Sequence, residues 1–328
     1  MGEEKKVLNN EGTNTEAVNK DDLFTFADYD AGNAERTGYS NYSYWASTWR
    51  VFTKNKAAMF FLCLLIALIL FTFIQPYLPG QKDPVEVYIN AETGKQERNA
   101  PPSSEYWFGT NSIGQDLWAR IWSGTRTSLF IGLAVGLWDA AAGIIVGSLW
   151  GYVRKLDTLI TEIYNVVNNI PSSIILILVS YLLKPSVGTI IFAMCLTGWI
   201  PTAKFIRNQI VIIRDREFNL ASRCLGTPTD RVVTKNLLPQ VISVIMMRVA
   251  LSIPLAIGHE VFLTYIGLGL PISIPSLGNL INEGRIVMMS PSLRYQLIFP
   301  SVVLSLITIS FYILGNSFAD AADPRNHV

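Results

Sequence analysis

Charged residues, histidines and cysteines are all scarce in this chain of 328 residues. Charged side chains make up 16% of it, and the net charge of +1 provides no field that would attract nucleic acid. The two histidines, His259 and His327, occur without an H-E-x-x-H motif, which excludes a His-based metalloprotease. No G-x-x-x-x-G-K-[ST] phosphate loop is present, so the sequence predicts no ATP site in this chain. The three cysteines are too widely spaced for a metal site or a disulfide framework.

Apolar residues, by contrast, are abundant and come in long runs. Half of the residues are hydrophobic, which is unlike a soluble domain. A helix needs about 20 mostly apolar residues to span a membrane, and six segments satisfy this requirement. They cover residues 57–78, 128–152, 159–183, 187–205, 241–263 and 297–315. The sequence therefore predicts an all-α polytopic membrane protein with six transmembrane helices, kinked at Pro171 and Pro254.

The distribution of basic residues predicts the orientation of these spans. Seventeen of the 26 Lys and Arg residues lie in the two tails and in the loops on the same side as the tails, and eight lie in the opposite loops. The remaining one, Arg248, lies within the fifth span. Because basic residues accumulate on the cytoplasmic side, both termini are predicted to be cytoplasmic.

The segments outside the spans suggest a division of the chain. Residues 1–43 are acidic and poor in apolar side chains, so we expect a disordered cytoplasmic tail. Trp45, Trp49 and Phe52 recur at helical spacing within 44–56, which fits either an interfacial amphipathic helix or a helix packed on the protein's own flank. The complete division is a tail 1–43, a helix 44–56, a first span 57–78, an extracellular loop 79–127 containing an interfacial helix, a core 128–316 and a cytoplasmic tail 317–328.

The most informative segment is the polar, basic stretch 207–239 between the fourth and fifth spans. Asp215 is positioned to cap a short helix, and Gly226 is positioned to end it in a left-handed conformation. Thr227 and Pro228 then fit the cap and first position of a second helix. Pro239 either closes that helix or opens the fifth span. A rigid, capped helix pair on the cytoplasmic side is typical of a docking surface.

The same segment resembles the coupling loop of bacterial ATP-binding-cassette importer permeases. The resemblance is carried by Glu217, Ala221, Arg223, Leu225, Gly226, Leu238 and Pro239, while Leu220, Ser222 and Asn236 depart from the family pattern. The segments 107–129, 198–210, 260–281 and 323–325 are similar to the second permease subunit of oligopeptide and dipeptide importers. The resemblance covers residues 44–325, most of the chain.

This resemblance implies a type I importer fold with a cytoplasmic coupling helix, and it implies partners. They are a homologous second permease, two ABC ATPases that bind ATP and Mg, and an extracellular binding protein that delivers peptide, all at the bacterial plasma membrane. No cofactor is expected in this chain. The residues expected to contact the ATPase are Arg214, Glu217, Phe218, Leu220, Ala221, Ser222, Arg223, Leu225 and Gly226.

Ionisable residues within the spans are candidates for the translocation path, because they are costly to keep in a membrane. Asp139 lies near the middle of the second span, either lining the path or packed as a structural residue. His259 and Glu260 lie near the outer end of the fifth span, and the resemblance suggests a structural or gate role for Glu260. Arg248 is expected to extend toward the cytoplasmic interface.

Alternative functions are a self-sufficient secondary transporter or channel, and an importer permease for nickel complexes or another solute. A gradient-driven carrier would show more paired intramembrane charges and repeated broken helices, and it would not need a capped docking element. The sequence favours the permease.

Overall fold

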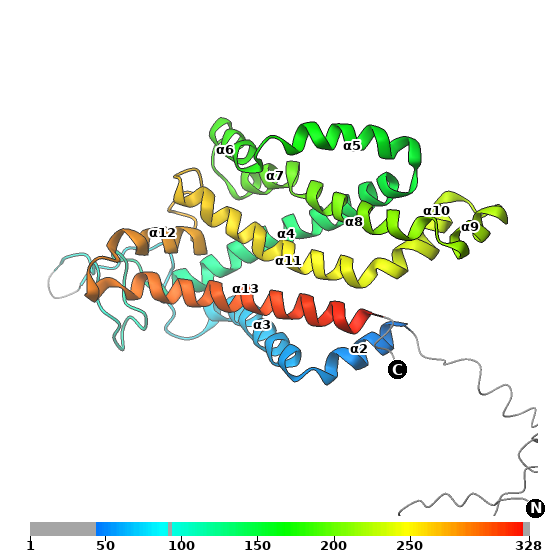
Figure 1. Ribbon diagram of the computed structural model, residues 1–328. Helices are drawn as coiled ribbons and strands as arrows, with labels where there is room; N and C mark the ends of the chain where they lie inside the picture. The colour runs from blue at the N-terminus through cyan, green and yellow to red at the C-terminus, as the bar shows by residue number, and fades with distance from the viewer. Residues whose placement is uncertain (1–43, 91–93, 324–328) are drawn as a thin grey trace, which may run out of the picture. The chain divides into compact units, whose positions relative to one another are not determined.

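The computed structural model describes residues 44–90 and 94–323, and these form a helical protein (Figure 1). The expected tail 1–43 and residues 324–328 of the expected C-terminal tail lie outside the described residues. The helices are α2 (Tyr44–Lys54), α3 (Lys56–Ile74), η2 (Gln75–Tyr77), α4 (Leu117–Tyr152), α5 (Arg154–Asn168), α6 (Ser172–Leu182), α7 (Val187–Thr197), α8 (Trp199–Arg214), α9 (Glu217–Cys224), α10 (Thr229–Arg231), η3 (Val232–Leu237), α11 (Leu238–Tyr265), α12 (Leu277–Val287), η4 (Pro291–Leu293) and α13 (Tyr295–Ala322).

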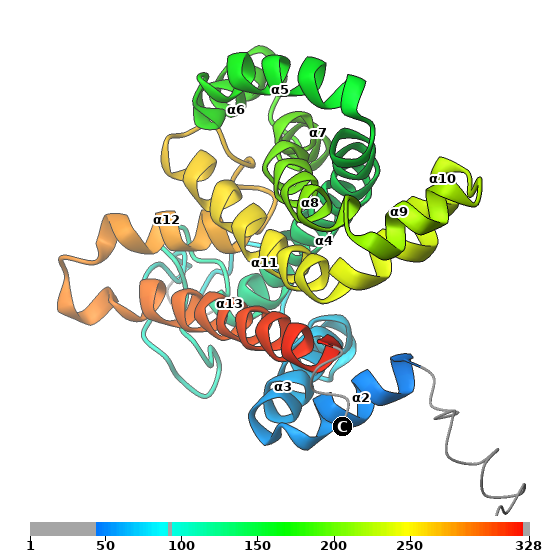
Figure 2. The same cartoon turned by 45° about the vertical axis from the view of Figure 1, so that its right-hand side comes forward.

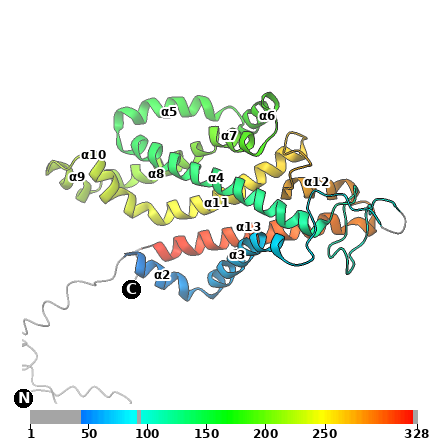
Figure 3. The same ribbon diagram turned by 180° about the vertical axis from the view of Figure 1, so that it is seen from behind.

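Within the described ranges, five helical stretches are long and apolar enough to cross a membrane, and a bent helix pair makes a sixth candidate. The five are Lys56–Tyr77, Leu117–Tyr152, Val187–Arg214, Thr229–Tyr265 and Tyr295–Ala322. The chain is therefore a multi-pass membrane protein, and the predicted all-α class is confirmed. The loop between η2 and α4 lies with α12 at one end of the bundle, and α9 and α10 lie at the other (Figures 1 and 3).

The third predicted span is broken rather than continuous. Helices α5 and α6 are bent by 71° relative to each other around Pro171. Proline lacks the amide hydrogen that a continuing helix needs, and its ring collides with the preceding turn. The kink predicted at Pro171 is thus a complete break, which carries α6 away from the direction of α5 (Figure 2).

The expected interfacial helix before the second span is wrong as a separate element. Residues 117–127 are the first turns of α4, a single helix of 36 residues capped by the Asp116 carboxylate, which accepts from Ala119 N at 2.8 Å. At 1.5 Å per residue the helix is about 54 Å long, longer than a bilayer core of about 30 Å. Within these first turns, Arg120 pairs with Glu283 at 2.8 Å, so its charge is held inside the protein.

Two other boundaries differ from the prediction. The C-terminal tail was expected from residue 317, but α13 continues through Ala322, where Ala321 and Ala322 are buried. Helix α2 packs on α13 through Phe52, whose ring lies 5.8 Å from that of Phe318. Trp49, on the same helix, keeps 53% of its surface exposed. Of the aromatic residues that recur along α2, Phe52 therefore packs on the protein's own flank, whereas Trp49 faces outward.

Helices α4 and α8 pack unusually closely because glycines of α4 face α8. A Cβ on Gly147 would lie 2.5 Å from the Ala203 carbonyl oxygen, and one on Gly143 would lie 2.6 Å from Thr202 Cγ2. One turn further along, a Cβ on Gly151 would lie 2.9 Å from the Arg207 carbonyl oxygen. Small residues at such a contact let two helix backbones approach each other within a membrane.

Candidate functional site

The predicted docking element is present as helix α9, which projects beyond the bundle at the end of α8 (Figures 1 and 2). It ends at Cys224, and Gly226, two residues further on, adopts φ +79° as the sequence predicted. Thr227 N donates to the Ser222 carbonyl oxygen at 3.1 Å, and Gly226 N donates to that of Arg223 at 3.0 Å. A left-handed residue that ends a helix in this way favours glycine, because a Cβ is strained there.

Both predicted N-caps in this region are wrong. Helix α9 begins after Arg216, without a side-chain cap, and Asp215 instead accepts from arginine side chains. Helix α10 begins at Thr229 after Pro228, so Thr227 is not its cap. Of the two positions expected for Pro239, the structure shows the second: α10 runs through a π-helical segment, Val232–Leu237, into α11, and Pro239 lies in the first turn of α11.

Asp215 holds α9 by ion pairs to three arginines. Its carboxylate lies 3.2 Å from Arg223 of α9, 3.3 Å from Arg214 of α8 and 3.3 Å from Arg154 of α5. Burial opposes the charged form, but the guanidinium groups of Arg223, Arg154 and Arg214 outweigh it and hold the pKa of Asp215 below its ordinary value. These ion pairs thus attach α9 to helices α5 and α8.

A second carboxylate extends this network to the broken span. Asp157 of α5 lies 2.7 Å from Arg207 and 3.6 Å from Arg214, both on α8. Arg214 also donates to the Gly151 carbonyl oxygen of α4 at 2.7 Å. Arg214 therefore contacts α4, α5 and Asp215, and it anchors α9 rather than offering a free surface.

The outward face of α9 is apolar. Phe218 and Leu220 are 46% and 44% exposed, and Leu225 just beyond the helix is 86% exposed. Glu217, Ala221 and Gly226 are exposed beside them, while Ser222 turns inward and accepts from Asn236 Nδ2 at 3.1 Å. Exposed apolar residues gathered on one short, anchored helix are characteristic of a protein contact surface.

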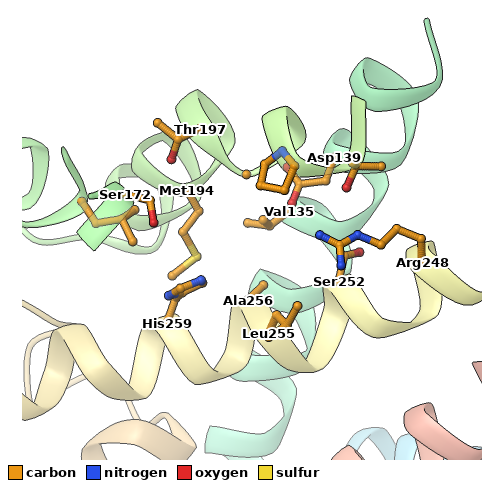
Figure 4. Close-up of a pocket in the computed structure, with 14 residues that line it drawn as sticks. Val135, Asp139, Ser172, Met194, Thr197, Arg248, Ser252, Leu255, Ala256 and His259 are labelled. Atoms are coloured by element: carbon orange, nitrogen blue, oxygen red, sulfur yellow. The ribbon is translucent and has the colours of Figure 1, made fainter. Parts of the chain in front are cut away.

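The second candidate site is a cavity of about 120 Å³ between α4, α6, α7, α8 and α11 (Figure 4). Asp139 and Val135 line it from α4, and α11 contributes residues spaced along one helical face. The α11 residues are Arg248, Ser252, Leu255, Ala256 and His259. The structure thus brings together two residues that the sequence singled out, Asp139 and His259.

Asp139 is buried in this cavity without a hydrogen-bond partner. It is 6% exposed, and no described residue bonds to its Oδ1 atom. Gly198 packs directly against it, since a Cβ there would lie 2.6 Å from the carboxylate oxygens. The carboxyl group therefore points into the cavity rather than into a polar network of the protein.

Arg248 lies in the same cavity, contrary to the expectation that it extends to the cytoplasmic interface. Its side chain points toward Ser252 and Asp139 (Figure 4). The spacing of Arg248, Ser252 and His259 at one helical face could have predicted this from the sequence. Because a carboxyl group lies nearby, placing the guanidinium in the cavity costs less free energy than placing it against an apolar surface.

Glu260 lies outside this cavity, although it neighbours His259 in the chain. It is fully buried and accepts hydrogen bonds from Ser276 at 2.7 Å, Ser128 at 3.2 Å and Thr264 at 3.3 Å. Ser128 in turn accepts from Leu277 N at 3.1 Å. These contacts join α4, α11 and the start of α12.

A family profile described as the binding-protein-dependent transport system inner membrane component matches residues 143–328, more than half of the chain. The chain belongs to this family. A second profile, the N-terminal TM domain of oligopeptide transport permease C, matches residues 43–102 of this permease. The two matches together cover α2, α3 and the helices from α5 to α13, and residues 103–142 lie between them.

Curated relatives of this permease extend over nearly its whole length. The oligopeptide transport system permease protein AmiD of Streptococcus pneumoniae is 38% identical over 93% of this chain and 97% of its own. The dipeptide transport system permease protein DppC of Bacillus subtilis is 37% identical over 86% of each chain. The oligopeptide permease OppC of the same organism is 33% identical over 92% of this chain and 97% of its own.

The fold of the permease is that of a type I ABC importer permease, as the sequence predicted. It matches a chain of the inward-facing MetNI methionine ABC transporter with a TM-score of 0.50. The match covers 62% of this chain and 96% of the other at 18% identity. At that identity the likeness concerns the fold alone.

Proposed function

We propose that this chain is one permease subunit of an ATP-driven importer of oligopeptides in the bacterial cytoplasmic membrane. The observation that carries the proposal is the apolar face of α9, held outside the bundle by Asp215 and Arg214, in a chain of the permease family. The names of its relatives, oligopeptide and dipeptide permeases, support peptides as substrate. The alternative of a self-sufficient secondary transporter or channel has no comparable support.

The partners follow from this assignment. A homologous second permease supplies the other half of the path, and two ABC ATPases bind ATP and Mg, with one of them docking on α9. An extracellular binding protein delivers peptide to the end formed by α12 and residues 78–90 and 94–116. The positive-inside distribution supports α9 and both termini on the cytoplasmic side.

This chain's share of the path is the cavity that contains Asp139 and His259. Glu260, which the sequence grouped with them, instead holds the surrounding helices in position through its three hydroxyl partners. Movement of α9 during the ATPase cycle would reach the cavity wall through α8, because α8 leads directly into α9 and lines the cavity through Pro201 and Thr202.

The test is substitution on the α9 face in the reconstituted importer. Ala221→Glu adds a bulky charge to an exposed position, and Gly226→Val strains a residue at φ +79° by about 1 kcal/mol or more. Both variants should insert in the membrane, lose co-purification with the ATPases and lower peptide uptake at least tenfold. Glu162→Ala, on the exposed surface of α5, serves as the control. Normal ATPase recruitment and uptake by Ala221→Glu would refute α9 as the docking element.

A further inference from the structure

The cavity of Figure 4 carries side chains of opposite charge that do not pair with each other. Asp139 comes from α4 and Arg248 from α11, and no ion pair or hydrogen bond joins them in the described structure. Asp139 Oδ1 and Arg248 Nε are both buried atoms without a hydrogen-bond partner among the described residues.

An unpartnered buried polar group costs about 1–3 kcal/mol, and more when it is charged. Other ionisable groups buried in the bundle have partners of their own: Glu260 accepts from three hydroxyls, and Arg120 bonds to Glu283 through Nη2, although its Nε, like that of Arg248, has no partner among the described residues. Two unsatisfied groups of opposite sign, aimed into one cavity, differ from this pattern. Such groups are typical of a site that completes its hydrogen bonds with a ligand.

We infer that this cavity is a binding site for a short zwitterionic peptide, with the ammonium group on Asp139 and the carboxylate on Arg248. The inference deepens the proposed function and rests on it for the choice of peptides. A carboxyl oxygen accepts from an ammonium group, and a guanidinium donates to a carboxylate, often through two parallel bonds.

The rest of the lining fits the body of such a ligand. The Ser252 and Thr197 hydroxyls can bond to a peptide group, and Leu176, Met194 and Leu255 offer an apolar surface to side chains. A cavity of about 120 Å³ holds several water molecules, so the two charged ends would displace water rather than protein. Selectivity for free termini would then reside partly in this permease.

The test is equilibrium binding to the purified complex of both permeases and both ATPases, without binding protein or nucleotide. The probe is radiolabelled trialanine, with unlabelled N-acetyl-trialanine and trialanine amide as competitors. Wild type should bind trialanine at least tenfold more tightly than either blocked peptide. Asp139→Asn should erase the difference between trialanine and its N-acetyl form, while Arg248→Gln should erase the difference between trialanine and its amide.

Asn keeps the shape that Gly198 accommodates, and monodispersity of each purified variant checks its folding. Glu162→Gln on α5 and Arg231→Gln on α10 are matched controls, since both residues are exposed and neither lines the cavity. These controls should keep the wild-type preference for free termini.

Two outcomes would overturn the inference: no saturable binding of trialanine to wild type, or equal weakening of all three ligands in both variants. The second result would mean that Asp139 and Arg248 only stabilise the helices. Failure of the proposed function looks different. It would appear as absent ATP-driven peptide uptake by the complete wild-type importer, whether or not trialanine binds.

Discussion

Two acidic residues within the spans, Asp139 and Glu260, have opposite surroundings, although both were candidates for the translocation path. Glu260 is bonded to Ser128, Thr264 and Ser276, whereas Asp139 Oδ1 has no bonding partner in the described structure. The difference comes from neighbours distant in the chain, since Ser128 lies 132 residues from Glu260. The sequence placed both residues within the spans, but it could not predict which of them would find hydrogen-bond partners.

Replacing Glu260 tests its structural role. Glu260→Leu would leave the three hydroxyls without their shared acceptor, at about 1–3 kcal/mol for each buried group left unsatisfied. We expect a clear loss of thermal stability in detergent, measured by fluorescence-detected size exclusion during heating. Glu86→Leu, on the exposed loop surface, is the control. Unchanged stability together with altered peptide selectivity would return Glu260 to the translocation path.

At the scale of elements, α9 is held in position by the ion pairs of Asp215, and no side chain caps its N-terminus. The left-handed Gly226 was predictable, because glycine after a short helical pattern has a specific backbone role. The role of Asp215 was not, because the arginines that bind it come from α5, α8 and α9 and meet only in the folded chain. The break at Pro171 was predictable in place, but its angle of 71° depends on the packing of α6 against α7.

Loss of the Asp215 carboxylate should loosen α9 without unfolding the bundle. Asp215→Asn removes the charge that binds Arg223, Arg214 and Arg154, so amide hydrogen exchange in 217–224 should accelerate several-fold while that in α4 stays unchanged. Asp323→Asn, at the end of α13, is the control. Identical exchange in 217–224 for wild type and Asp215→Asn would mean that the ion pairs do not restrain α9.

The same attachment has a defined pH dependence. Because the folded pKa of Asp215 is lower than its ordinary value of 3.8, the ionised carboxylate stabilises the attachment above that pH. The contribution is lost as the pH falls through the lower, folded value. Exchange in 217–224, corrected for intrinsic rates, should therefore be constant from about pH 5 to pH 8. A transition within that range would have to come from another group.

At the scale of the whole molecule, the orientation in the membrane is the prediction with the widest consequences. Single cysteines at Glu86 and Gln96, in a variant lacking Cys63, Cys195 and Cys224, should react with a membrane-impermeant maleimide added to intact cells. Cysteines at Thr229 and Lys235 should react only after the cells are opened, because the basic side of the protein is predicted to be cytoplasmic. External labelling of Lys235→Cys would invert the orientation and remove α9 from the reach of cytoplasmic ATPases.

The close contact between α4 and α8 has a mechanical consequence. Interlocked backbones at Gly143, Gly147 and Gly151 leave no space into which either helix can yield, so the pair is as incompressible as a protein core. A displacement of α9 would then be transmitted through α8 to α4 and to the cavity wall that carries Asp139. Deformation must concentrate where the chain is less constrained, at the Pro171 break and in the π-helical segment before α11. The glycines thus determine which parts of this permease move as one body and which parts bend.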